Sequence, residues 1–96
     1  MANALVSVQI IPKTKNGEDS IPYVDAAIDV IEQSGVKYQV NPLETTMEGE
    51  LTALFSIIEK MNEKMASLGC PSIISQVKVF YKPDGTSMDV LTEKYR

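Results

Sequence analysis

Hydrophobic and polar residues alternate near the start of the chain, and this alternation predicts a β-strand over residues 5–11. One face of the strand is wholly apolar and consists of Val6, Val8 and Ile10. The other face is mixed and consists of Leu5, Ser7, Gln9 and Ile11. Pro12 is expected to end the strand, and the polar segment 13–20 after it predicts a loop.

Apolar residues then recur at helical spacing, which predicts a helix over residues 22–34. Its apolar stripe consists of Val24, Ala27, Ile28 and Ile31. Ser20 is the expected N-cap, and Pro22 is tolerated in the first turn. Gly35 is expected to end the helix because glycine readily adopts the left-handed conformation.

Two short strands are predicted next, over residues 36–41 and 44–49, with a tight connection around Asn41–Leu43. In the first of them Tyr38 and Val40 share one face, while Gln39 and Asn41 share the other. Alternation therefore places Tyr38 with the residues that should face the core.

A long amphipathic helix follows, over residues 51–68, and Gly69 and Pro71 end it. Its apolar positions lie three and four residues apart, and they are Leu51, Leu54, Phe55, Ile58, Met61, Met65 and Leu68. The methionines could form a plastic binding surface, but their helical spacing favours core packing.

The last long strand is predicted over residues 73–82, with the turn signal Pro83-Asp84-Gly85 closing it. Residues 87–95 predict a short terminal helix capped by Ser87. The order strand, helix, strand, strand, helix, strand indicates one α+β domain over residues 1–96. We expect a βαββαβ arrangement, a four-stranded antiparallel sheet with two helices on one face and a short C-terminal helix.

The predicted uncovered face of the sheet mixes amides with large apolar side chains. Its polar members are Ser7, Gln9, Gln39, Asn41, Gln76 and Lys78, and its apolar members are Leu5, Ile11, Ile74 and Phe80. Such a mixture is typical of subunit contacts or of a ligand surface, and plain solvent exposure is the alternative. We therefore expect self-association through this face.

The amino-acid composition limits the kinds of functional site that the chain can form. The net charge is −4, the only arginine is Arg96, histidine is absent, and Cys70 is the only cysteine. Nucleic-acid binding needs clustered positive charge, which is lacking, and a Cys/His zinc site cannot be assembled. No nucleophile with an adjacent base is visible, so we expect a protein that is not an enzyme and uses no cofactor or metal. Cys70 is expected to be a small, semi-buried residue.

The sequence also lacks the residues that three known kinds of site on this architecture require. An acylphosphatase-like site needs an internal arginine, a copper-chaperone site needs two cysteines, and an RNA-binding sheet needs more exposed aromatic residues than Phe80. The N-terminus has no basic, apolar leader and no segment is long enough to span a membrane, so a cytoplasmic location is expected.

Carboxylates cluster where the short strands meet the second helix. Glu44, Glu48 and Glu50 surround Thr45 and Thr46. A carboxylate here could bind a cation or accept a hydrogen bond from an amine. Alternatively, Glu48 and Glu50 favour the positive end of the helix that follows.

Two segments resemble the small thiamine-binding protein family with a YkoF-like, ferredoxin-like fold. They are Val6-Ser-Val-Gln-Ile-Ile-Pro12 and Gly35-Val-Lys-Tyr-Gln-Val-Asn-Pro-Leu-Glu-Thr-Thr-Met-Glu-Gly49, and the most specific part is Tyr38-x-Val40-x-Pro42 followed by Thr45-x-x-Glu48-Gly49. The resemblance covers nearly the whole chain. Two departures are Glu44, where the family often has glycine, and Lys82-Pro83-Asp84, where it often has an arginine-containing basic stretch.

The resemblance implies a non-catalytic cytoplasmic protein that binds thiamine or its hydroxymethylpyrimidine part and forms homodimers or homotetramers through sheet contacts. On this basis we expect Glu48 to bind the amine or cation, and Thr45 or Thr46 to bind ring nitrogens. Asn41, Ser7 and Gln9 complete the expected polar set. Tyr38 could stack on the ligand, although alternation favours the core. The main alternative function is a regulatory or structural oligomerisation module without a physiological ligand.

Overall fold

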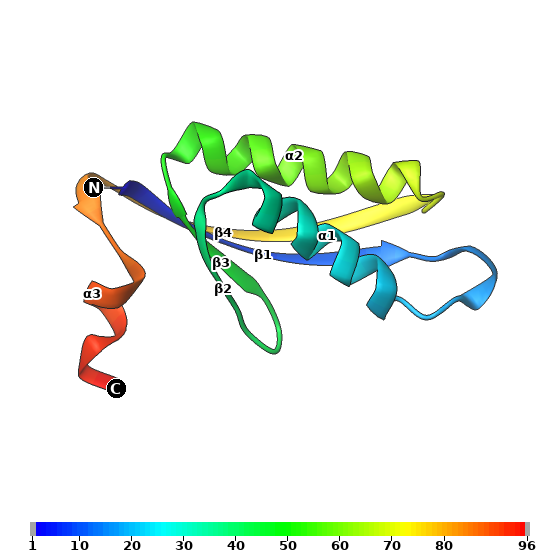
Figure 1. Cartoon of the computed structure of the whole chain (residues 1–96), viewed down its shortest axis with the longest axis horizontal. Helices are drawn as coiled ribbons and strands as arrows, with labels where there is room; N and C mark the ends of the chain where they lie inside the picture. The colour runs from blue at the N-terminus through cyan, green and yellow to red at the C-terminus, as the bar shows by residue number, and fades with distance from the viewer. Residues whose placement is uncertain (1, 96) are drawn as a thin grey trace.

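The computed structural model describes residues 2–95 as a four-stranded antiparallel sheet with two long helices packed along one face (Figure 1). The strands run in the order β2-β3-β1-β4 across the sheet. The elements are β1 (Ala2–Lys13), a 3₁₀ turn (Lys15–Gly17), α1 (Ile21–Ser34), β2 (Lys37–Val40), β3 (Thr45–Gly49), α2 (Leu51–Ser67), β4 (Ser72–Thr86), α3 (Met88–Thr92) and a second 3₁₀ turn (Glu93–Tyr95). This is the predicted ferredoxin-like βαββαβ arrangement with its short C-terminal helix.

The core lies between the sheet and the inner faces of α1 and α2. It contains strand and helix residues that the sequence predicted, namely Val6, Val8, Ala27, Ile31, Leu54, Met61 and Met65, together with Met47 and Ile57, which were not predicted. Phe55 and Leu68, predicted on the apolar stripe of α2, are instead exposed. The methionines of α2 are therefore core residues, and Cys70 is buried beside them. Val40 and Val79, predicted to face the helices, remain about half exposed because they lie on the outer strands β2 and β4.

Two prolines do not end their strands, contrary to the prediction. At Pro12, β1 pairs with β4 alone, since β3 reaches only as far as Val8. A proline is tolerated on such an open edge because its missing N–H breaks no ladder bond there. The Pro83-Asp84-Gly85 segment forms a bulge inside β4, where the single residue Asn3 of β1 faces residues 82–85.

Two of the three predicted helix caps, Gly35 and Ser87, are confirmed, and the third, Ser20, is only partly right. Ser20 occupies the N-cap of α1 but its side chain makes no capping bond; instead the Ile21 N–H donates to Asp19 Oδ1 at 3.1 Å. Gly35 ends α1 in the left-handed region, at φ +81°, as predicted. Ser87 caps α3 as predicted, because its Oγ accepts from the Val90 N–H. Within residues 2–95, no helix is long and apolar enough to cross a membrane.

Candidate functional site

The sheet has a notch at the corner where β3 stops short of the end of β1. β3 pairs with β1 over Ala4–Val8, whereas β4 pairs with β1 as far as Lys13. The β2–β3 turn lies beside this notch and is closed by a hydrogen bond of 2.9 Å from the Asn41 N–H to the Glu44 carbonyl. A cavity of about 310 Å³ opens between the turn, β1 and α1.

The walls of this notch cavity are apolar, with a few polar groups. Val8 and Ile10 of β1, Val24 and Ile28 of α1, and Met61 of α2 supply the apolar surface. The polar lining residues are Gln9, Ser20, Glu44 and Thr45. Its volume lies at the small end of the range of about 300–1,000 Å³ for small-molecule sites, and its lining has their usual composition. The cavity therefore suits a small ligand.

A chain of polar contacts crosses the open face of the sheet next to the cavity. Ser7 Oγ on β1 and Thr46 Oγ1 on β3 lie 2.6 Å apart, and Glu44 Oε1 accepts from Lys78 Nζ of β4 at 2.9 Å. The Ser7 hydroxyl also helps to stabilise the negative charge of the Glu44 carboxylate. In the bond between Ser7 and Thr46 either hydroxyl can be the donor.

These contacts fix the charge of Glu44. Its pKa is lowered, first by the hydrogen bond from Lys78 and then by that from Ser7, both of which stabilise the carboxylate form. Glu44 therefore carries a full negative charge at neutral pH. Its side chain is 27% exposed, so the charge is partly sheltered by the turn and the sheet.

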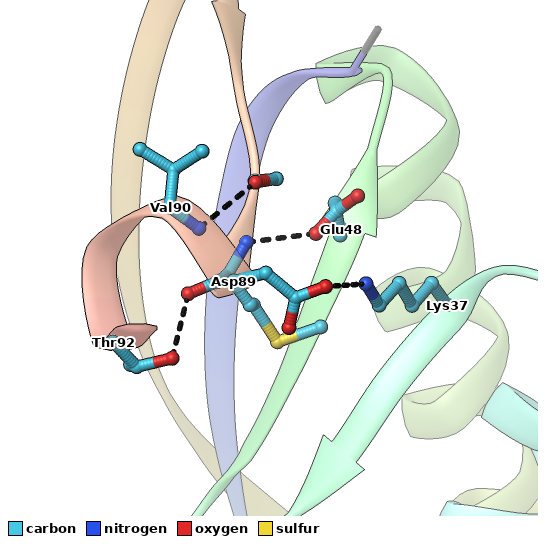
Figure 2. A network of polar contacts seen from close by, with 7 residues as sticks. Lys37, Glu48, Asp89, Val90 and Thr92 are labelled. Atoms are coloured by element: carbon cyan, nitrogen blue, oxygen red, sulfur yellow. Dashed lines mark hydrogen bonds and ion pairs between the residues drawn. The ribbon is translucent and has the colours of Figure 1, made fainter. Parts of the chain in front are cut away.

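Glu48 lies further along the same open face and serves a different partner. Its carboxylate accepts the Met88 N–H of α3 at 2.8 Å, and Lys37 of the neighbouring strand β2 pairs with Asp89, also at 2.8 Å. Figure 2 shows Glu48, Lys37 and Asp89 lying together at this point. The Met88 side chain is buried. Glu48 thus anchors the first turn of the C-terminal helix to the sheet.

The seven site residues expected from the sequence lie in different parts of the structure. Ser7, Gln9 and Thr46 lie on the open face, around Glu44, and Asn41 lies in the adjacent turn, where its Oδ1 accepts from Gln39 Nε2 at 3.1 Å. Thr45 lies on the helix-facing side, buried, and lines the notch cavity. Tyr38 packs against the core and Glu48 contacts α3, so neither lines the cavity.

Sequence reasoning did not assign Glu44 and Lys78 to one another, although both were noted. They are separated by 34 positions, and they meet only because β1 lies between β3 and β4. Strand alternation did contain part of the signal, since Lys78 pairs with Ser7 across the sheet and so shares its face. The exposed Leu43 at the tip of the turn, another lining residue of the cavity, was also not singled out.

Known proteins resemble this chain along almost its whole length. The profile of the family described as "Thiamine-binding protein" matches residues 6–96. A UPF0045 protein of Clostridium perfringens is 45% identical over 93 residues, which cover 95% of each chain.

Solved structures share the fold. A DUF77 protein from Bacillus cereus has a TM-score of 0.93 and 34% identity, over 99% of this chain and 91% of that one. A protein from Thermotoga maritima, described as a candidate for thiamine biosynthesis or salvage, has a TM-score of 0.87 and 26% identity, over 98% of this chain and 99% of that one.

Proposed function

The chain belongs to the thiamine-binding protein family, and from this premise we propose that it is a cytoplasmic, non-catalytic protein that binds thiamine or its aminopyrimidine part. The notch cavity is the observation that carries this proposal. It combines apolar walls with two polar lining residues, the buried Thr45 and Gln9. An aminopyrimidine ring has flat apolar faces and an edge of hydrogen-bond donors and acceptors, and this cavity complements both.

The edge of β1 beside the notch supports the same assignment. Over residues 9–11 this edge has no partner in β3, and Pro12 beyond them lacks an N–H. An unpaired strand edge presents a row of N–H and C=O groups, the pattern that an aminopyrimidine edge can pair with. In this proposal Thr45 and Gln9 contact the ring, Asn41 holds the turn in place, and Ser7 and Thr46 orient Glu44.

We include self-association in the proposal, as a homodimer or homotetramer formed through the open face. This face carries the exposed apolar side chains Ile11, Ile74 and Phe80 beside the polar chain, a mixture typical of subunit contacts. Sedimentation at micromolar concentration tests this part, and a monomer throughout would refute it without affecting the ligand assignment.

Calorimetric titration with thiamine and with hydroxymethylpyrimidine tests the ligand proposal directly. Thr45→Val keeps the shape of the side chain but removes its hydroxyl, so affinity should fall about two- to tenfold, the cost of one neutral hydrogen bond. Thr52→Val is the matched control, because Thr52 is exposed on the first turn of α2, at the opposite end of β3 from the cavity.

A thermal-shift assay gives an independent readout. A ligand present at 100 times its Kd adds about 2.7 kcal/mol to the free energy of unfolding. Failure of both compounds to raise the melting temperature or to give binding heat would refute the proposal. The oligomerisation module without a ligand would then be the better description.

A further inference from the structure

Glu44 lies where the notch cavity meets the open face of the sheet. It lines the cavity together with Thr45, and it also lines two hollows of the open face, one beside Gln76 and the other beside Phe80. A ligand that filled the cavity and extended out of it would pass this carboxylate. The Glu44 carboxylate contacts Lys78 on the open face, so it is placed to act on the part of a ligand that projects from the cavity.

The two side chains of the Glu44–Lys78 ion pair differ in their exposure to solvent. The Glu44 side chain is 27% exposed, whereas the Lys78 side chain is 79% exposed. A carboxylate that is partly withdrawn from water exerts a stronger field than a fully solvated one. The lysine reaches it from solvent, and exposed pairs of this kind contribute little and are screened by salt. The ammonium group can thus be exchanged for another cation at low cost.

On the premise that the cavity holds an aminopyrimidine, we infer that Glu44 is a specificity-determining residue that selects ligands with a positive charge next to the ring. The positive group of the ligand takes the place of the Lys78 ammonium on the Glu44 carboxylate. The Ser7 hydroxyl, which is hydrogen-bonded to Thr46, also stabilises the carboxylate, and this contribution does not depend on Lys78.

The chemical class selected is a small aromatic ligand whose enclosed ring is neutral and whose projecting group is a permanent cation. Thiamine has this form, since the quaternary nitrogen of its thiazolium ring carries a positive charge at neutral pH. Free hydroxymethylpyrimidine occupies the cavity without reaching Glu44 and gains nothing from the carboxylate. A change in the ratio of the two affinities when Glu44 is substituted therefore reports on this contact.

The test is a calorimetric titration of both compounds into the full chain and four variants. Glu44→Gln should weaken thiamine binding about two- to fivefold, the range for a partly exposed charge contact, and leave hydroxymethylpyrimidine unchanged. Lys78→Met should strengthen thiamine binding, because it removes the competing ammonium group. Glu59→Gln and Lys60→Met, on the exposed side of α2, make the same charge changes away from the cavity and should alter neither affinity.

The opposite signs of the two variants separate this role from a structural one. If the ion pair only held the turn in place, Glu44→Gln and Lys78→Met would both weaken both compounds, and the inference would be wrong. An unchanged affinity ratio in Glu44→Gln would overturn it as well, while leaving the proposed function intact. If the wild-type chain binds neither compound, the proposed function fails and the inference fails with it.

Discussion

Replacing Glu48 with alanine should release α3 from the sheet while leaving the rest of the fold intact. The Glu48 carboxylate accepts the Met88 N–H at 2.8 Å across 40 positions of sequence. A hydrogen bond to a charged group is worth about 1.5–3 kcal/mol. Two other contacts hold the helix: burial of the Met88 side chain, and the pair Lys37–Asp89, whose side chains are both more than half exposed.

Amide hydrogen exchange in α3 is the appropriate assay, because local release of a terminal helix changes exchange more than it changes global unfolding. The N–H groups of Val90 and Glu93, which donate within α3, report on it. A loss of about 1.5–3 kcal/mol corresponds to an exchange rate raised about 10- to 100-fold. Glu48→Gln should show a smaller increase, because its amide oxygen can still accept the bond.

Glu50→Ala is the control for this experiment. Glu50 carries the same charge two residues further on, at the N-cap of α2, where its side chain makes no capping hydrogen bond. Its removal should leave exchange in α3 unchanged. If Glu48→Ala also leaves the Val90 and Glu93 amides protected, then α3 is not anchored by Glu48, and our reason for excluding Glu48 from the ligand site is lost.

Two further predictions concern stability. Leu54→Ala should lower the free energy of unfolding, measured by urea denaturation, by about 2–5 kcal/mol and the melting temperature by about 10 °C or more, because Leu54 is 0% exposed. Phe55→Ala, on the outer side of the same helix, should lower the free energy of unfolding much less. Equal losses in the two variants would contradict the packing described. The folded-state pKa of Glu44 lies below its ordinary value of 4.5, so its stabilising contribution is complete above that value and is lost as the pH falls through the folded-state pKa. The melting temperature of the wild type should accordingly approach that of Glu44→Gln as the pH falls below about 4.5, and a constant difference would refute this assignment.

The fold was predictable because each main element carries a complete local pattern. The alternation of Val6, Val8 and Ile10 needs no tertiary information to indicate a strand with one buried face, and the stripe of α2 is equally explicit. Strand ends were less predictable. Pro12 and Pro83 usually mark the end of a strand, and both remain within strands here because β3 leaves one edge open and β4 takes up a bulge.

The site was predictable only in part, since its contacts join distant segments. Thr45 and Thr46 could have been separated from the sequence, because alternation places Thr45 with the apolar Met47 and Thr46 with the charged Glu48. The partner of Glu48 could not have been found in this way. It is a backbone N–H of a five-residue helix, and nothing in the sequence shows where that helix docks.

The bulge in β4 also bears on how the protein avoids aggregation. β4 is an outer strand of 15 residues, and a long outer strand invites the addition of further chains to the sheet. The bulge at residues 82–85 breaks the regular ladder near one end of this strand, and Pro83 lacks the N–H that an incoming chain would need. Only the regular part, residues 72–81, offers a continuous edge. Fibril growth along this edge is thereby limited, and restoring a regular strand through residues 82–85 would remove that protection.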